Sequence, residues 1–182
     1  MEEPESIKAD WVHLALRQYE GPLLRYAAQI TGDLESARDV VQDTFVRLCA
    51  EEPDRLRGRL AQWLFTVCRN RALDIKRKEK RMTSIEEIQM EVRESREPSP
   101  AAAAEGNDGM GHVLRMLATL PPNQQEVIRL KFQNGLSYQE ISRTTQLTVT
   151  NVGFLIHTAI KTIRRQLERE ARPSANISRK IS

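Results

Sequence analysis

The chain has 182 residues, a formal net charge of +3 and two cysteines, which suits one medium domain or two small ones and excludes a disulfide-rich scaffold. No apolar run approaches the ~20 residues that a membrane-spanning helix needs, and the acidic N-terminal stretch lacks the apolar core of a signal sequence. We therefore expect a soluble, cytoplasmic protein in which Cys49 and Cys68 are buried free thiols.

Charge is distributed unevenly along the chain. Residues 51–82 carry ten basic and five acidic side chains, residues 83–110 carry two and seven, and residues 111–172 carry nine and four. Two basic blocks separated by an acidic one indicate two anion-facing surfaces. Apolar residues recur at helical spacing throughout, which predicts an all-α fold of two small helical domains joined by a flexible linker.

The first domain is predicted to span residues 1–82. A helix or helix pair over 10–30 is interrupted by Gly21-Pro22 and stops at Gly32. Asp33 is placed to cap a second helix over 34–50, and a loop over 51–60 follows. The core stripe of the second helix is predicted to consist of Ala37, Val40, Val41, Thr44, Phe45 and Leu48.

The helix predicted over 61–81 is the most informative of this domain. Its apolar stripe is formed by Leu64, Val67, Cys68, Ala72 and Ile75. The opposite side carries Thr66, Arg69, Asn70, Arg77 and Lys80. A helix of this kind packs on a folded domain and presents a cationic face to a polyanion. The pattern alone leaves two alternatives open, an ordinary solvated surface and a nucleic-acid contact.

Residues 83–110 are predicted to be a flexible acidic linker, because they are polar, punctuated by Pro and Gly, and poor in apolar side chains. A second domain is predicted over 111–170, and a basic tail over 171–182. The first two helices of the second domain are predicted to end at Pro121-Pro122 and at Asn134-Gly135.

The rest of the second domain has the layout of a helix-turn-helix module. Ser137 and Glu140 form a capping box for a helix over 138–144, and Thr148 caps a last helix that runs to about Arg169. A small helical bundle with a polar surface is the alternative. The predicted core stripe of the last helix is Val149, Val152, Ile156, Ala159, Ile160, Ile163 and Leu167. Its predicted groove-facing set is Thr150, Phe154, His157, Thr158, Lys161 and Arg165, with Arg143 on the preceding helix.

Four motifs in this order and spacing resemble the extracytoplasmic-function (ECF) sigma factors of bacterial RNA polymerase, a branch of the sigma-70 family. The resemblance covers roughly residues 10–170. The motifs are Asp39-Val-Val-Gln-Asp-Thr-Phe45, then Trp63-Leu64 followed by Arg69-Asn70 and the Lys/Arg run, then Leu120-Pro121, and then Gly135-Leu-Ser-Tyr-Gln-Glu-Ile141 with Val152 and His157.

The resemblance implies a promoter-specificity subunit that binds core polymerase, recognises promoters and opens DNA, without catalytic activity or a cofactor. In such a protein Asp39, Gln42, Asp43 and Val46 would meet a coiled coil of the largest polymerase subunit. Asn70 would line a pocket for a flipped base of the minus-ten element, and the last helix would contact the minus-thirty-five element. The family usually also has an anti-sigma partner.

The last helix departs from the family pattern, because Gly153, Phe154, Leu155 and Thr158 stand where many relatives carry Lys or Arg. We therefore expect Thr150, Phe154 and Thr158 to contact thymine methyls or A·T-rich shape, and Lys161, Arg164 and Arg165 to contact phosphates. Phe154 has packing against protein as its alternative.

Two other function classes compete with the sigma factor. The runner-up is a stand-alone helix-turn-helix regulator that binds operators without polymerase. A DNA-processing enzyme would need a metal or nucleophile cluster, and the three histidines, His13, His112 and His157, are scattered.

Overall fold

The computed structural model describes residues 4–87 and 108–170; the predicted tail and most of the predicted linker lie outside these residues. The described part is helical, and the chain divides into two compact units. The first includes helices α1 to α4, and the second includes α5, α6, the π-helix η1 and α8. Residues 139–146, which form most of α7, are grouped with the first unit. Each unit is described by itself.

The first unit begins with one long helix, α1 (Pro4–Thr31). The predicted interruption at Gly21-Pro22 is wrong, because Pro22 lies inside the continuous helix. Pro22 has no N–H to donate to the carbonyl of Gln18, but Gln18 is exposed, so solvent can replace the lost hydrogen bond.

Helix α2 (Leu34–Cys49) follows as predicted, and its cap is confirmed. The Ser36 backbone N–H donates to Asp33 Oδ1 at 2.8 Å, which lowers the pKa of the Asp33 carboxyl. All six residues of the predicted core stripe of α2 are buried. The predicted loop over 51–60 contains a single helical turn, α3 (Pro53–Leu56), because Leu56 packs into the core with 2% of its surface exposed.

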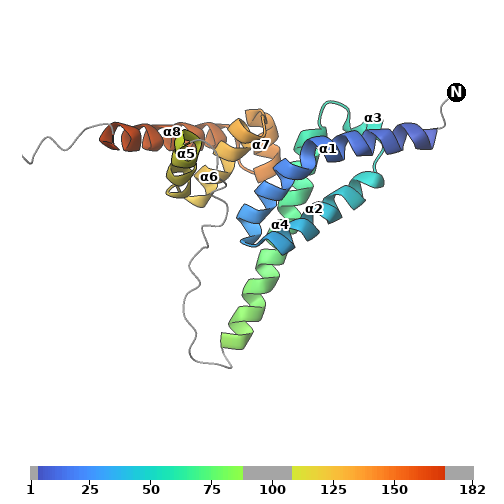
Figure 1. The fold of residues 1–182 in the computed structure, drawn as a ribbon, viewed down its shortest axis with the longest axis horizontal. Coiled ribbons are helices and arrows are strands. Elements are labelled where there is room, and N and C mark those ends of the chain that lie inside the picture. Colours follow the sequence, from blue (N-terminus) through green and yellow to red (C-terminus); the bar gives the residue numbers. More distant parts are fainter. Residues whose placement is uncertain (1–3, 88–107, 171–182) are drawn as a thin grey trace, which may run out of the picture. The chain divides into compact units, whose positions relative to one another are not determined.

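Helix α4 (Leu60–Glu87) packs on α1 and α2, and its C-terminal half extends beyond them (Figure 1). It continues past the boundary predicted at residue 82. Leu64, Cys68 and Ala72 are fully buried, while the outer members of the predicted stripe are half-buried. Phe65 was not predicted in the core stripe, but it is buried, and its ring meets that of Tyr26 edge to face with centroids 5.4 Å apart.

The second unit begins with α5 (Asp108–Ala118) and α6 (Pro122–Ile128), which both pack on α8 (Val149–Glu170). A π-helical turn, η1 (Arg129–Gln133), continues α6. Between η1 and α8 the chain forms α7 (Tyr138–Thr145). The turn that joins α7 to α8 holds Gln146 at φ 62°, a left-handed conformation that the sequence does not signal because it usually favours Gly or Asn.

The predicted core stripe of α8 needs a correction. Val149, Ile160 and Leu167 are 44%, 37% and 42% exposed, whereas Leu155, expected on the groove side, is only 6% exposed. The buried set Val152, Leu155, Ile156 and Ala159 follows the spacing i, i+3, i+4, i+7, so the core face is centred between Leu155 and Ile156.

Candidate nucleic-acid interface

The side chains on the polar face of α4 differ in exposure and in hydrogen bonding. Thr66 is half-buried and its hydroxyl donates to the Gln62 carbonyl at 2.7 Å, so this hydroxyl already satisfies a helix group. Asn70 is exposed, one residue after the half-buried Arg69. The amide of Asn70 has both a donor and an acceptor to offer a base edge.

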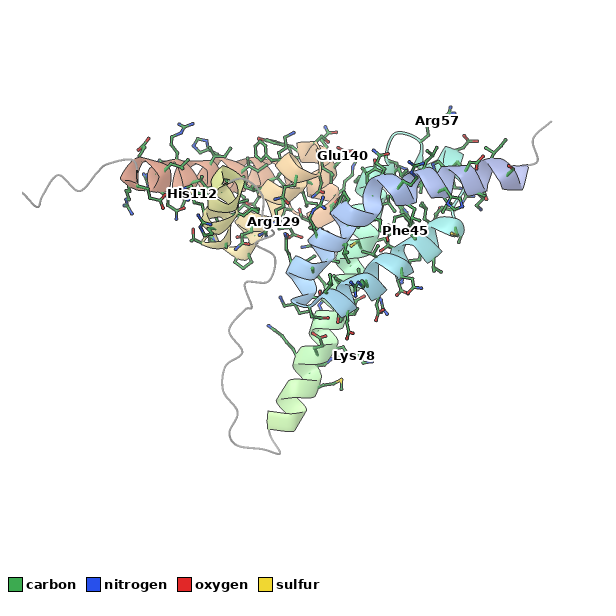
Figure 2. The ribbon with its side chains drawn as sticks, viewed as in Figure 1. Phe45, Arg57, Lys78, His112, Arg129 and Glu140 are labelled. Atoms are coloured by element: carbon green, nitrogen blue, oxygen red, sulfur yellow. The ribbon has the colours of Figure 1, made fainter. Side chains whose placement is uncertain are left out.

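The C-terminal half of α4 is a cationic surface. Every residue from Lys76 to Met82 is exposed, and Figure 2 shows Lys78 on the part of α4 that extends beyond α1 and α2. The guanidinium of Arg77 lies 3.4 Å from the Asp74 carboxylate, one turn earlier on the same exposed face. Ion pairs with this exposure are weak and exchange with salt, so the cation of Arg77 stays available to a polyanion.

The loop before α4 is anchored by its one apolar residue. Leu56 is buried, Gly58 has φ 74°, and Arg59 Nε donates to the Arg55 carbonyl at 2.8 Å. The positive φ explains why glycine stands at this turn. Arg57, next to the buried anchor, projects from the loop (Figure 2). The arrangement places three arginines in the segment that leads into α4.

The four residues of α2 predicted to bind polymerase differ in exposure and in their contacts. Asp39, Gln42 and Val46 are exposed, and Val46 keeps 64% of its surface accessible. Asp43 instead forms an ion pair with α4, since its Oδ2 lies 2.7 Å from Arg71 Nε. The sequence analysis did not select Arg71, because charge pairing between helices leaves no signal in their spacing.

A hollow of about 530 Å³ lies beside Val46, between α1 and α2. Phe45 lies between these two helices in Figure 2. Most of the lining side chains are apolar, and Glu20, Arg38 and Gln42 are the polar ones among the lining residues. The lining residues are Val12, Leu16, Glu20, Leu24, Arg38, Val41, Gln42, Phe45, Val46 and Cys49.

In the second unit, most of the predicted groove-facing side chains of α8 are exposed. They are Thr150, Phe154, His157, Lys161 and Arg165. Thr158 is half-buried, and its carbonyl accepts from Thr162 Oγ1 at 3.0 Å. Arg143 is exposed on α7. Thr148 Oγ1 accepts from the Asn151 backbone N–H at 3.2 Å, which confirms the cap of α8.

Gly153 faces an aromatic ring of its own unit. A Cβ at Gly153 would lie 3.7 Å from Cε2 of Tyr138, an ordinary contact distance, so the glycine is not required for this packing. Lys131 Nζ lies 5.4 Å from the centroid of the same ring, within the range of a cation–π contact. Gly153, which stands where many relatives carry Lys or Arg, therefore lies beside Tyr138.

The two thiols differ, and the expectation that both are buried is wrong for one of them. Cys68 is fully buried, and burial raises its pKa from 9.0 to about 12. Cys49 is exposed at the end of α2, because it follows the last buried residue, Leu48. Neither forms a disulfide.

Within the described ranges, no group of three or more His, Cys, Asp or Glu side chains is arranged to hold a metal ion. Over the same residues, no helix combines the length and apolarity needed to cross a membrane.

The geometry of both units agrees with comparisons to known protein families. The family model "Sigma-70 region 2" matches residues 15–82, and the model "Sigma-70, region 4" matches residues 111–163. The chain belongs to the sigma-70 family. The polar face of α4 therefore lies in a sigma region 2 and α8 in a sigma region 4, which contains the predicted helix-turn-helix.

Individual ECF sigma factors match most of the chain. The ECF RNA polymerase sigma factor SigL of Mycobacterium tuberculosis is 29% identical over 157 residues, 83% of this chain and 85% of that protein. SigM of Bacillus subtilis, also an ECF sigma factor, is 26% identical over 136 residues, 74% of this chain and 82% of that protein. The chain therefore belongs to the ECF branch of the sigma-70 family.

Solved structures of sigma factors share the fold. The sigma factor RpoE of Bartonella quintana, crystallised with the anti-sigma factor NepR, gives a TM-score of 0.62 at 20% identity and covers 86% of this chain and 96% of that one. CnrH, solved with the cytosolic domain of CnrY, gives a TM-score of 0.54 at 24% identity and covers 87% of this chain and 88% of that one. At these identities the likeness concerns the fold alone.

Proposed function

We propose that this ECF sigma factor divides its work between three surfaces: α2 for core polymerase, α4 for the minus-ten element and α8 for the minus-thirty-five element. The observation that carries the proposal is the construction of α4. Its Leu64–Cys68–Ala72 face is locked in the core, while Asn70 and the run Lys76–Arg81 face outward on the same helix. One rigid element thus offers both a base-reading amide and a phosphate-binding surface.

The polymerase contact is assigned to the exposed part of α2. Asp39 and Gln42 lie within two turns before the apolar Val46 on the exposed side of α2, and Gln42 and Val46 also line the hollow between α1 and α2. An apolar centre loses water on binding, while the polar groups around it orient the partner. The family resemblance implies that a helical coiled coil of the largest polymerase subunit binds this surface.

The minus-ten contact is assigned to α4 and the loop before it. Asn70 would accept a base taken out of the stack, with Thr66 and Arg69 one turn or less away. Arg77 and Lys80 would neutralise phosphates on the more distal turns. Opening of the DNA is favoured because unpaired bases gain contacts that paired bases lack.

The minus-thirty-five contact is assigned to the exposed side of α8. No lysine or arginine occurs between residues 149 and 160, so the first three turns lack the side chains that read guanine best. Phe154 and Thr150 offer apolar surface to thymine methyls, and Lys161 and Arg165 reach phosphates from the later turns. Upstream recognition then depends more on A·T content and shape than on guanine contacts.

An anti-sigma factor is the expected regulatory partner. The support is that RpoE of Bartonella quintana was solved with the anti-sigma factor NepR, and CnrH with the cytosolic domain of CnrY. A protein of this kind would control access to the DNA-binding and polymerase-binding surfaces.

A DNA-binding assay with and without core polymerase tests the proposal. We expect weak, salt-sensitive binding of the purified chain to promoter DNA, and specific binding only when core is added. Tight specific binding without core would favour a stand-alone regulator instead.

A further inference from the structure

The polymerase-facing side of α2 consists of three residues that share a face. Asp39, Gln42 and Val46 follow each other at steps of three and four residues, so they stack along one side of the helix. Asp43 lies about 100° further round from Gln42. Its contact with Arg71 shows that this side of α2 faces α4.

Arg71 occupies a central place on α4. It directly follows Asn70 and directly precedes Ala72, which has no exposed surface. Its Nε lies 2.7 Å from the Asp43 carboxylate, although the N–H is not aligned for a hydrogen bond. The side chains of Arg71 and Asp43 are 41% and 44% exposed, so water partly screens the pair.

The ion pair connects a turn of α2 that is proposed to bind polymerase with a turn of α4 that is proposed to bind promoter DNA. On α2, Asp43 belongs to the same turn as Gln42. On α4, Arg71 belongs to the same turn as Asn70. A shift of α2 relative to α4 would change this contact directly, because its two charged groups lie on different helices.

We propose that Asp43 is a positioning residue for the promoter-reading turn of α4 and not a polymerase contact: it holds Arg71 and thereby fixes the turn that presents Asn70. The inference rests on the proposed function of α4. It removes Asp43 from the polymerase-binding set and adds Arg71 to the residues that set the geometry of promoter opening.

The test compares Asp43→Asn, Arg71→Gln, the double variant and Arg71→Lys, each assembled with core polymerase. Core affinity is measured by fluorescence titration, and promoter opening is measured as permanganate reactivity at saturating holoenzyme. We expect core affinity to stay within about twofold and opening to slow about two- to fivefold, the range that a partly exposed ion pair yields. Gln42→Ala is the matched control on the polymerase face and should weaken core binding.

Two further results are expected if Asp43 acts through Arg71. The double variant should open DNA no more slowly than Arg71→Gln alone, and Arg71→Lys should recover at least half of the wild-type rate. Thermal unfolding of each variant checks that the fold is retained.

Several outcomes would overturn the inference. They are a loss of core affinity in Asp43→Asn that matches Gln42→Ala, additive effects in the double variant, or opening that is unchanged or faster. Failure of the wild-type chain to direct any promoter-specific initiation would instead refute the proposed function, and the two failures are therefore distinguishable.

Discussion

Phe154 and Leu155 are neighbours in the sequence, but they occupy opposite environments on α8: Phe154 is 65% exposed and Leu155 is 6% exposed. Leu155 belongs to the buried face of α8, while the aromatic ring of Phe154 is exposed and is proposed to contact a partner. We therefore expect Leu155 to contribute to stability and Phe154 to contribute to recognition, so the two residues make a matched pair for mutation.

Leu155→Ala should lower the free energy of unfolding by about 2–5 kcal/mol, because it leaves a cavity in the core of the second unit. Phe154→Ala should leave stability within about 0.5 kcal/mol and reduce affinity for the upstream promoter element. Urea titration followed by far-UV circular dichroism is the suitable measurement, because both tryptophans, Trp11 and Trp63, lie in the first unit. Equal stability losses in the two variants would contradict the assignment.

Val46→Asp should reduce affinity for core polymerase about tenfold or more, because it places an unpaired carboxylate in the apolar centre of the proposed contact. Leu14→Asp is the control: Leu14 is 65% exposed against 64% for Val46, and it does not line the hollow between α1 and α2. Competition binding with a labelled holoenzyme separates them. If Leu14→Asp weakened binding as much as Val46→Asp does, the polymerase face would be placed wrongly.

Asn70→Ala should slow promoter opening about tenfold while leaving core affinity unchanged, because only the contact to the extruded base is lost. Lys78→Ala, on the same helix, should act differently. It should weaken binding to all DNA sequences and lower the slope of affinity against salt by ~1. Opening rates at saturating holoenzyme distinguish the two, and an unchanged rate in Asn70→Ala at a weak promoter would refute the pocket.

The two cysteines should differ in reactivity. A thiol reagent should modify Cys49 in the native protein and reach Cys68 only after unfolding, because the buried thiol stays protonated with a pKa of about 12. Counting modified thiols with and without denaturant checks this. Two fast-reacting thiols in the native protein would show that the core of the first unit is open.

The raised pKa of Cys68 also predicts that the stability of the protein depends on pH. The pKa of Cys68 is higher in the folded state than in the unfolded state. The contribution of its protonated thiol to the free energy of unfolding is therefore fully present below the ordinary pKa of 9.0, and it is lost as pH rises from there toward about 12. Wild type should therefore lose stability across this window faster than Cys68→Ala does. Denaturant midpoints measured at pH 8 and pH 10 give the comparison, and parallel losses would contradict the shift.

The helical fold, most core positions of α2 and α4 and the caps at Asp33 and Thr148 were predictable because they depend on local spacing and local hydrogen bonds. The continuity of α1 through Pro22 was not, since a proline is a local signal for a break and only the surrounding packing decides whether the helix continues. The core face of α8 was predicted in part. Val152, Ile156 and Ala159 are buried as expected, but Leu155 was not selected, because apolar residues lie on both the buried and the exposed side of this helix.

For the candidate sites, the sequence predicted which helix face is exposed but not which contacts each side chain makes. Exposure at Asn70, Val46 and Phe154 agrees with the predicted outward faces, although none of their contacts is tested by the fold. The Asp43–Arg71 pair was not predictable, because it joins residues on two helices whose relative rotation is set by the whole core.

Run-off transcription with core polymerase, with and without this chain, tests the central claim most directly when the RNA start sites are sequenced. We predict a new set of start sites that appears only with the chain and shares upstream sequence elements. Identical start sites from core alone would contradict the account.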